Sequence, residues 1–320
     1  MKSLPEHSPK KRPFVPDSLL FDFQVNGFGG VDFQRDDISI GDLRRATLAL
    51  RQHGVRAILA TLTTADIMKL SRRFEGFERA RTHDRDISQM IAGYHLEGPW
   101  ISPLPGFRGA HPADPIHAPS ISEFNRLQGA AGGRIRLVTL APEWPGSPEF
   151  IAEIVRQGVH VSLGHTDASD TEIDGAIKAG ARFATHLGNG TPAVLPRHDN
   201  IIQRLLSRDE LTACLIPDGV HLPPFVLRNL FRAKPPGRVL FTTDAMAGAG
   251  APPGNYTLGD MAVVIGADRI ARQPGGEGFA GSTLTPDEGM SRTAAFLDLS
   301  LPEARRLWSE VPAAAFGVVL

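Results

Sequence analysis

The sequence predicts an α/β protein of the (β/α)8, or TIM-barrel, type. Its 320 residues contain eight short apolar runs that alternate with longer amphipathic stretches, and strand–helix alternation of this length predicts parallel strands. Most of the apolar runs end in a histidine, a carboxylate or an amide, and the carboxyl ends of barrel strands form a single rim. Eight repeats without a second apolar core favour a closed barrel over an open sheet.

The apolar runs are the expected strands, at residues 19–24, 55–61, 90–96, 135–140, 159–163, 182–186, 211–216 and 239–243. Helical patterns lie between them, at 40–52, 67–81, 120–129, 148–157, 169–179, 200–207 and 223–232. Asp17 and Ser169 suit turns or helix caps, and Ser147-Pro148 places a proline in the first turn of its helix.

Beyond the last strand, the sequence predicts a hairpin and two helices. Residues 255–273 form the hairpin, with its turn at Gly259-Asp260, and the helices lie at about 286–298 and 302–315. Residues 1–17 are polar and rich in proline, which predicts a flexible leader. The expected organisation is therefore one catalytic domain, residues 18–320, with a hairpin insertion near 255–273.

Composition excludes several classes of protein. The formal net charge is −1, from 34 basic and 35 acidic residues, so no overall field marks a nucleic-acid or membrane partner. Cys214 is the one cysteine; it excludes a disulfide within the chain and a cysteine-based zinc site, and its apolar surroundings predict a buried thiol. The N-terminus lacks the apolar core of a signal peptide, so we expect a cytoplasmic protein.

The strand ends supply a candidate metal site. Glu97, His165 and His186 follow or end the third, fifth and sixth apolar runs; one carboxylate, two imidazoles and a water would form an open catalytic zinc site. Asp244, after the eighth run, would take a proton from the water and deliver it to a leaving amine. A single His or Asp at a strand end is usually a cap, but turn chemistry does not require this combination. The set therefore predicts metal-assisted hydrolysis.

Longer motifs around these residues resemble those of a known enzyme family. They are His95-Leu-Glu97-Gly-Pro-Trp, Gly164-His165-Thr-Asp-Ala, Thr185-His186-Leu-Gly-Asn-Gly-Thr-Pro, Asp218-Gly-Val-His221 and Thr242-Thr-Asp244-Ala-Met-Ala-Gly. In this order they resemble the successive signatures of N-acetylglucosamine-6-phosphate deacetylases, which are metal-dependent amidohydrolases. The opening segment 22–32 and the late segment Phe279-Ala-Gly281-Ser-Thr-Leu-Thr285 are similar too, so the resemblance covers roughly residues 19–315.

The resemblance implies a role for each matching position. Glu97, His165 and His186 would hold one divalent metal, for which zinc fits best and Fe²⁺, Co²⁺ or Mn²⁺ are alternatives, and Asp244 would be the general acid/base. His111 would stabilise the oxyanion near the acetyl carbonyl. The implied substrate-binding residues, which would contact the sugar or its phosphate, are Ala110, Asn189, Gly190, Arg197, His221, Phe279, Ala280 and Gly281. A homodimer is expected, because a phosphate-contacting side chain can come from the neighbouring subunit in this family; Arg197 and His221 are the candidates.

Two features depart from the family pattern. Many amidohydrolases have a His-x-His pair after strand one, which supports a second metal, whereas this chain has Gln24-Val-Asn26. Neutral amides are weak zinc ligands, so we expect one tightly held metal. The small β-sandwich that usually flanks the barrel is expected to be absent, because strand one starts after about 18 residues and the chain stops at Leu320.

The substrate remains open among three readings. The first is the acetamide of N-acetylglucosamine 6-phosphate, and the second is another N-acyl amino sugar or sugar phosphate. The third is a barrel that binds a sugar phosphate without catalysis; the intact set of Glu97, His165, His186 and Asp244 speaks against it.

Overall fold

The computed structural model describes residues 19–275 and 278–320, and the predicted leader, residues 1–17, lies outside them. An eight-stranded sheet has the order β1-β4-β5-β6-β7-β8-β9-β10, and every pair of neighbours is parallel. The barrel strands are β1 (Leu20–Val25), β4 (Val55–Thr63), β5 (Ile91–Glu97), β6 (Ile135–Leu140), β7 (His160–Leu163), β8 (Phe183–Ala184), β9 (Thr212–Leu215) and β10 (Val239–Phe241). The predicted barrel is confirmed.

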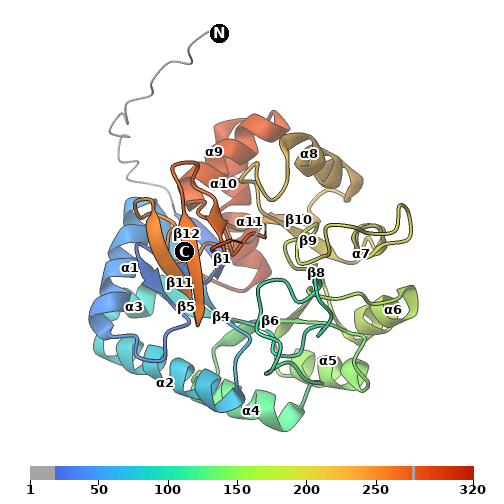
Figure 1. The fold of residues 1–320 in the computed structure, drawn as a ribbon, viewed down its shortest axis with the longest axis horizontal. Coiled ribbons are helices and arrows are strands. Elements are labelled where there is room, and N and C mark those ends of the chain that lie inside the picture. The colour runs from blue at the N-terminus through green and yellow to red at the C-terminus, as the bar shows by residue number, and fades with distance from the viewer. Residues whose placement is uncertain (1–18, 276–277) are drawn as a thin grey trace.

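The helices surround this sheet (Figure 1). They are α1 (Ile40–Gln52), α2 (Ile67–His83), α3 (Arg85–Met90), α4 (Ile121–Ala130), α5 (Ser147–Arg156), α6 (Asp170–Ala179), α7 (Ile201–Leu206), α8 (Pro224–Ala233), α9 (Pro286–Leu297), α10 (Leu301–Leu307) and α11 (Glu310–Ala315). Ser169 caps α6 in a capping box with Glu172, as its position predicted. The sequence analysis missed the short helix α3, which Asp84 caps by accepting hydrogen bonds from the amides of Asp86 and Ile87.

Side chains rather than a strand ladder close the barrel between β1 and β10. The fully buried carboxylate of Asp22 in β1 accepts hydrogen bonds from the hydroxyls of Thr242 and Thr243 and from the Thr243 amide, at 3.2 Å. One isolated parallel bridge joins Val25 to Ala245 just beyond the strand ends. The first and last barrel strands are therefore held together directly below the residues that follow them at the rim.

The expected helix at 302–315 is two helices, so this prediction was wrong. Pro312 lies in α11 and has no N–H to donate to the carbonyl four residues earlier, that of Trp308. The Trp308 carbonyl accepts instead from the amide of Phe21 in β1, at 2.8 Å. The break between α10 and α11 therefore docks the end of the chain onto the first barrel strand.

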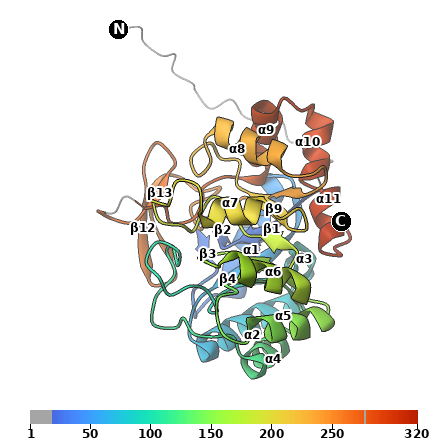
Figure 2. The same ribbon diagram turned by 90° about the vertical axis from the view of Figure 1, so that its right-hand side faces the viewer.

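The two ends of the barrel are covered differently (Figure 2). At one end, the ring of Phe316, directly after α11, lies 5.0 Å from Phe23 and 5.1 Å from Phe183. The buried thiol of Cys214 belongs to the same apolar cluster. This cluster fills the end of the barrel away from the rim that carries the predicted site.

Small sheets cover the other end. The predicted hairpin is present as β11 (Gly254–Leu258) and β12 (Met261–Ile265), and β13 (Ala271–Arg272) adds a third strand. Asp32, in the two-stranded sheet of β2 (Gly27–Phe28) and β3 (Val31–Asp32), anchors the hairpin turn by accepting from the Gly259 amide and the Thr257 hydroxyl, both at 2.8 Å. Within residues 19–275 and 278–320 these two small sheets are the only sheets outside the barrel.

In the described parts of the chain, no helix has the length and apolar character needed to cross a membrane.

Candidate active site

Three predicted site residues have an unusual backbone. His165, His186 and Asp244 follow β7, β8 and β10 with φ values of 51°, 29° and 51°. The backbone of residues other than glycine rarely adopts this left-handed region, and backbone strain of this kind concentrates at functional sites. The turn at each strand end thus departs from the extended conformation where a functional side chain is presented to the rim.

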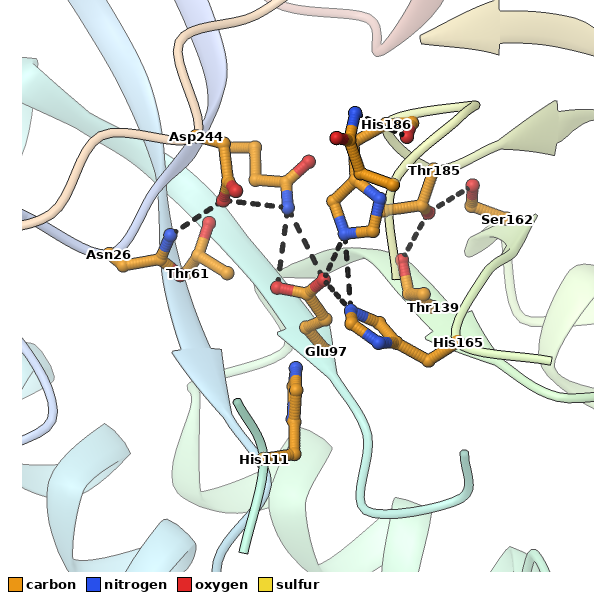
Figure 3. Close-up of polar contacts among 12 residues, drawn as sticks. Asn26, Thr61, Glu97, His111, Thr139, Ser162, His165, Thr185, His186 and Asp244 are labelled. Atoms are coloured by element: carbon orange, nitrogen blue, oxygen red, sulfur yellow. Dashed lines mark hydrogen bonds and ion pairs between the residues drawn. The ribbon is translucent and has the colours of Figure 1, made fainter. Parts of the chain in front are cut away.

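Glu97, His165 and His186 converge on one point (Figure 3). The Nε2 atoms of the two histidines lie 3.1 Å apart, and each is 3.2 Å from Oε1 of Glu97. Ligands of a tetrahedral zinc ion at about 2.0–2.2 Å are separated by roughly 3.3–3.6 Å, so the three donor atoms are spaced slightly closer than metal ligands would be. All three side chains are buried.

The ring orientation of His165 suits a metal ligand. Its Nδ1 lies 2.9 Å from the carbonyl oxygen of Phe107, and because a carbonyl can only accept, Nδ1 carries a proton and Nε2 is the ring nitrogen that would bind a metal. Gly109 and Gly190 pack against this ring so closely that a Cβ at either would approach it to 2.9–3.0 Å. The donor set therefore fits a divalent cation.

Charge reinforces this interpretation. Burial acts to raise the pKa of Glu97, but hydrogen bonds from His165 and His186 outweigh it and hold the pKa well below its usual value. Glu97 is therefore ionised, as a metal-binding carboxylate must be.

Asp244 lies beside this set and is held by two amides. The Nδ2 of Asn26 donates to Oδ1 of Asp244 at 2.7 Å, and the Nε2 of Gln24 donates to the same oxygen at 3.0 Å. Gln24 also reaches both oxygens of Glu97 at 3.3 Å. Burial, and then the charge of Glu97, raise the pKa of Asp244 from 3.8 to about 7, so this carboxyl can both accept and release a proton near neutral pH.

His111 completes the group. Its ring centroid lies 4.4 Å from that of His165, and Figure 3 shows it on the opposite side of Glu97 from Asp244. Its Nδ1 is 2.7 Å from the hydroxyl of Thr64. Burial and the neighbouring His165 lower the pKa of His111 to about 3, so it is a neutral imidazole that donates from Nε2 when the Thr64 hydroxyl donates to Nδ1.

Two of the residues predicted to bind the sugar phosphate lie beside the metal-ligand set. Asn189 and Gly190 line a small surface pocket together with His165. Gly190 has a φ of 62°, which favours glycine. Ala110 is half-buried in the loop before His111.

A second group is organised around His221. Asp218 accepts from the Nδ1 of His221 at 2.6 Å, and the ring of Phe279, itself 43% exposed, lies 4.9 Å from the His221 ring. Because Asp218 binds Nδ1, the Nε2 of His221 remains available to a ligand.

The remaining predicted residues differ in accessibility. Arg197 is exposed in the loop before α7 and, among the described residues, has no hydrogen-bond or ion-pair partner. Ala280 is fully buried in a cluster with Met246 and Ile265, so neither its side chain nor its backbone is exposed to a sugar in this structure. Gly281 is half-buried against Met246, in the loop after Asp244.

Sequence reasoning missed the residues that hold the predicted ones. Gln24 and Asn26 were noted only as poor metal ligands, and Thr64 was not considered. The signal that could have found the amides is the barrel itself, since its closure makes the first and eighth strand ends neighbours.

Comparisons with known proteins agree with this geometry. No protein-family model matches the chain. It is 30% identical over 301 residues to N-acetylglucosamine-6-phosphate deacetylase of Bacillus subtilis (strain 168), covering 93% of this chain and 74% of the relative. It is 33% identical over 297 residues to N-acetylgalactosamine-6-phosphate deacetylase of Shewanella sp. (strain ANA-3), covering 92% and 72%.

Solved structures point the same way. N-acetyl-D-glucosamine-6-phosphate deacetylase of Mycobacterium smegmatis, in complex with N-acetyl-D-glucosamine-6-phosphate, superposes with a TM-score of 0.84 at 32% identity, covering 94% of this chain and 77% of that one. The enzyme from Thermotoga maritima superposes with a TM-score of 0.81 at 27% identity, covering 96% and 82%. By sequence and by fold, the chain belongs to the N-acetylglucosamine-6-phosphate deacetylase family.

Proposed function

We propose that this protein hydrolyses the acetamide of N-acetylglucosamine 6-phosphate to acetate and glucosamine 6-phosphate. The observation that carries the proposal is the convergence of the Glu97, His165 and His186 donor atoms within 3.2 Å of one another, beside the carboxyl of Asp244. A buried metal-ligand set next to an acid/base with a pKa near neutrality suits amide hydrolysis.

Each residue has a definite part in this reaction. A divalent cation held by Glu97, His165 and His186, for which zinc is our choice, supplies Lewis acidity toward the acetyl carbonyl and an acidic water. Asp244 takes a proton from the attacking water and passes it to the departing nitrogen, so that the C–N bond breaks to give a free amine and a carboxylic acid. His111 donates from Nε2 to the developing oxyanion.

The phosphate and sugar are assigned to the outer residues. Arg197 offers a guanidinium fork that matches a phosphate, and His221 offers its free Nε2. Asn189, with the backbone of Gly190, faces the sugar from the His165 side, while Ala110 and the 279–281 segment line its other faces. In a homodimer, Arg197 or His221 would serve the site of the neighbouring subunit.

The test is acetate release from N-acetylglucosamine 6-phosphate by purified, zinc-loaded protein, beside the isosteric variant Asp244→Asn. We expect turnover by the wild type and a loss of at least about 10²-fold in the variant, since general acid–base catalysis contributes on the order of 10²–10⁴-fold. Folded, zinc-loaded wild type that releases no acetate contradicts the proposed reaction. Equal turnover by both proteins contradicts the role of Asp244.

Substrate choice needs a separate comparison. Arg197→Ala should raise KM for the phosphorylated substrate and leave the turnover of unphosphorylated N-acetylglucosamine unchanged. The control is Arg306→Ala, which removes an exposed arginine of α10 and should change neither value. N-acetylgalactosamine 6-phosphate is the competing substrate, because a relative of that name is 33% identical to the chain. Higher kcat/KM for the galactosamine epimer would reassign the substrate while keeping the chemistry.

Metal content distinguishes catalysis from binding alone. A hydrolase of this type should retain about one equivalent of metal through purification, whereas a sugar-phosphate-binding barrel has no need of one. Protein that binds the sugar phosphate without metal or turnover would favour the non-catalytic reading.

A further inference from the structure

The two amides that replace a His-x-His pair make specific contacts with the acid/base residue. Asn26 and Gln24 both donate to one oxygen of Asp244, Oδ1, at 2.7 and 3.0 Å. Figure 3 shows the side chain of Asn26 pointing to that carboxyl. Among the described residues, no side chain or backbone group hydrogen-bonds to the other oxygen, Oδ2.

The orientation of both amides is fixed by chemistry. Ionised carboxylates only accept hydrogen bonds, so the N–H₂ group of Gln24 must face Glu97, and that of Asn26 must face Asp244 whenever Asp244 is ionised. A flipped amide would place its oxygen against a carboxylate oxygen. Gln24 and Asn26 are 1% and 3% exposed, so water cannot readily replace them as donors.

We propose that Gln24 and Asn26 are positioning residues that hold Asp244 by Oδ1 and leave Oδ2 free for proton transfer. This inference rests on the proposed function, in which Asp244 is the acid/base. The two amides therefore fill the place of further metal ligands with neutral hydrogen-bond donors.

The backbone supports the same arrangement. The amide of Asn26 donates to the carbonyl of Ala245 at 2.7 Å, and Val25 forms a parallel bridge with Ala245. The residue after Asp244 is thus bonded to the same segment of β1 that supplies the two amides. Asp244 itself has a left-handed backbone with a φ of 51°, a conformation that persists only where its surroundings fix it.

Gln24 also links the base to the metal-ligand set. Its Nε2 lies 3.3 Å from each oxygen of Glu97 and 3.0 Å from Asp244. One amide group therefore sets the distance between two carboxylates that would otherwise repel each other. Displacing a reacting group by about 1 Å can cost on the order of 10²-fold in rate.

The kinetic test uses Asn26→Leu, which keeps the side-chain size and removes the donor. We expect kcat to fall by about 10-fold to 100-fold, KM to stay within about twofold, and metal content to stay at the wild-type value. The matched control is Gln128→Met. Gln128 makes two hydrogen bonds to the backbone of Ile135 in β6. This variant therefore loses a partly buried amide far from Asp244, and its kcat should equal that of the wild type. If Asn26→Leu does not fold, Gln24→Met takes its place.

Two results would overturn the proposal. One is a kcat within twofold of wild type in the folded variant. The other is a fall in kcat that is matched by a loss of bound metal or by an equal fall in the Gln128→Met control, since either would indicate a structural role.

A second readout does not depend on turnover. In ¹H–¹⁵N spectra, the side-chain amide resonances of Asn26 and Gln24 should move in Asp244→Ala while that of Gln128 does not. If the wild type releases no acetate, the proposed function fails, and these resonances still decide whether the amides hold Asp244. If the resonances do not move, the proposal that Gln24 and Asn26 hold Asp244 is contradicted, even in an active enzyme.

Discussion

The buried carboxylate that closes the barrel should leave a measurable signature in stability. Asp22 is fully buried between β1 and β10, and burial raises its pKa from 3.8 to about 6 despite hydrogen bonds from Thr242 and Thr243. Its folded-state pKa therefore lies above its unfolded value. The stability that it contributes is fully present below pH 3.8 and is lost as the pH rises through about 6.

The size of the effect follows from the two pKa values. The folded-state pKa of about 6 lies about 2 pH units above 3.8, which is equivalent to about 3 kcal/mol in the free energy of unfolding. About half of this free energy is lost between pH 5 and pH 8. A chain of 320 residues has an unfolding entropy near 0.7 kcal/mol/K, so this loss lowers Tm by about 2 °C.

Asp22→Asn removes this titration and leaves the other ionisable groups in place. At pH 5, where Asp22 is mainly protonated, the variant should be less stable than the wild type, because the amide nitrogen of asparagine cannot accept the hydrogen bonds that a carboxyl oxygen accepts and an unsatisfied buried donor costs about 1–3 kcal/mol. The difference in Tm should then shift in favour of the variant by about 2 °C on going to pH 8.

Thermal unfolding of both metal-loaded proteins at pH 5, 6, 7 and 8 provides the measurement, and subtracting the two curves cancels the titration of shared groups. A difference in Tm that is independent of pH would refute the assignment of a raised pKa to Asp22.

Three further outcomes are expected. Glu97→Gln should abolish tight metal binding and lower acetate release by at least about 10²-fold, as measured by metal analysis and turnover; full metal content in the variant would contradict the ligand assignment. Phe316→Ala should lower stability by about 3–5 kcal/mol, measured by urea unfolding, and leave KM unchanged because the ring packs at the other end of the barrel; a raised KM would show that the two ends are coupled. The negative charge of Glu97 helps to raise the pKa of Asp244 toward 7, and a bound divalent cation should offset that charge. Because Asp244 must be ionised to take a proton, the midpoint of the acid limb of the kcat/KM pH profile should lie below pH 7. A midpoint above pH 7 in the zinc-loaded enzyme would contradict this expected direction of the shift.

Periodicity predicted the barrel because each βα unit has its own local signal. The expected strand at 135–140 matches β6 (Ile135–Leu140), and the helix at 40–52 matches α1 (Ile40–Gln52). Errors occur where tertiary contacts decide the boundary of an element. The strand expected at 182–186 is only Phe183–Ala184 in the structure, where it is β8. It ends early because the chain turns at Thr185 and His186, which directs the His186 ring toward the site. The break between α10 and α11 at Trp308 could have been predicted from Pro312, because proline lacks the N–H that would continue the helical hydrogen bonds.

The metal-ligand set was predictable because parallel strands bring their carboxyl ends to one rim. The left-handed φ of His165 and Asp244 was not, since neither residue type demands it. The hydrogen bond of Asn26 is to a residue 218 positions away, which only barrel closure brings into contact. Sequence patterns thus predicted which side chains meet at the rim better than they predicted the side chains that hydrogen-bond to them.

The arrangement of charge around Asp244 explains why neutral donors suit the end of β1. Two carboxylates, Glu97 and Asp244, are surrounded mainly by protein, and each disfavours ionisation of the other. Histidines at positions 24 and 26 would draw Asp244 toward a second cation and stabilise its ionised form. Gln24 and Asn26 instead donate hydrogen bonds without adding charge, so Asp244 keeps a pKa high enough to hold a proton between its removal from water and its delivery to the amine. On this argument, the Gln-x-Asn sequence is a feature of the acid/base as much as a loss of metal ligands.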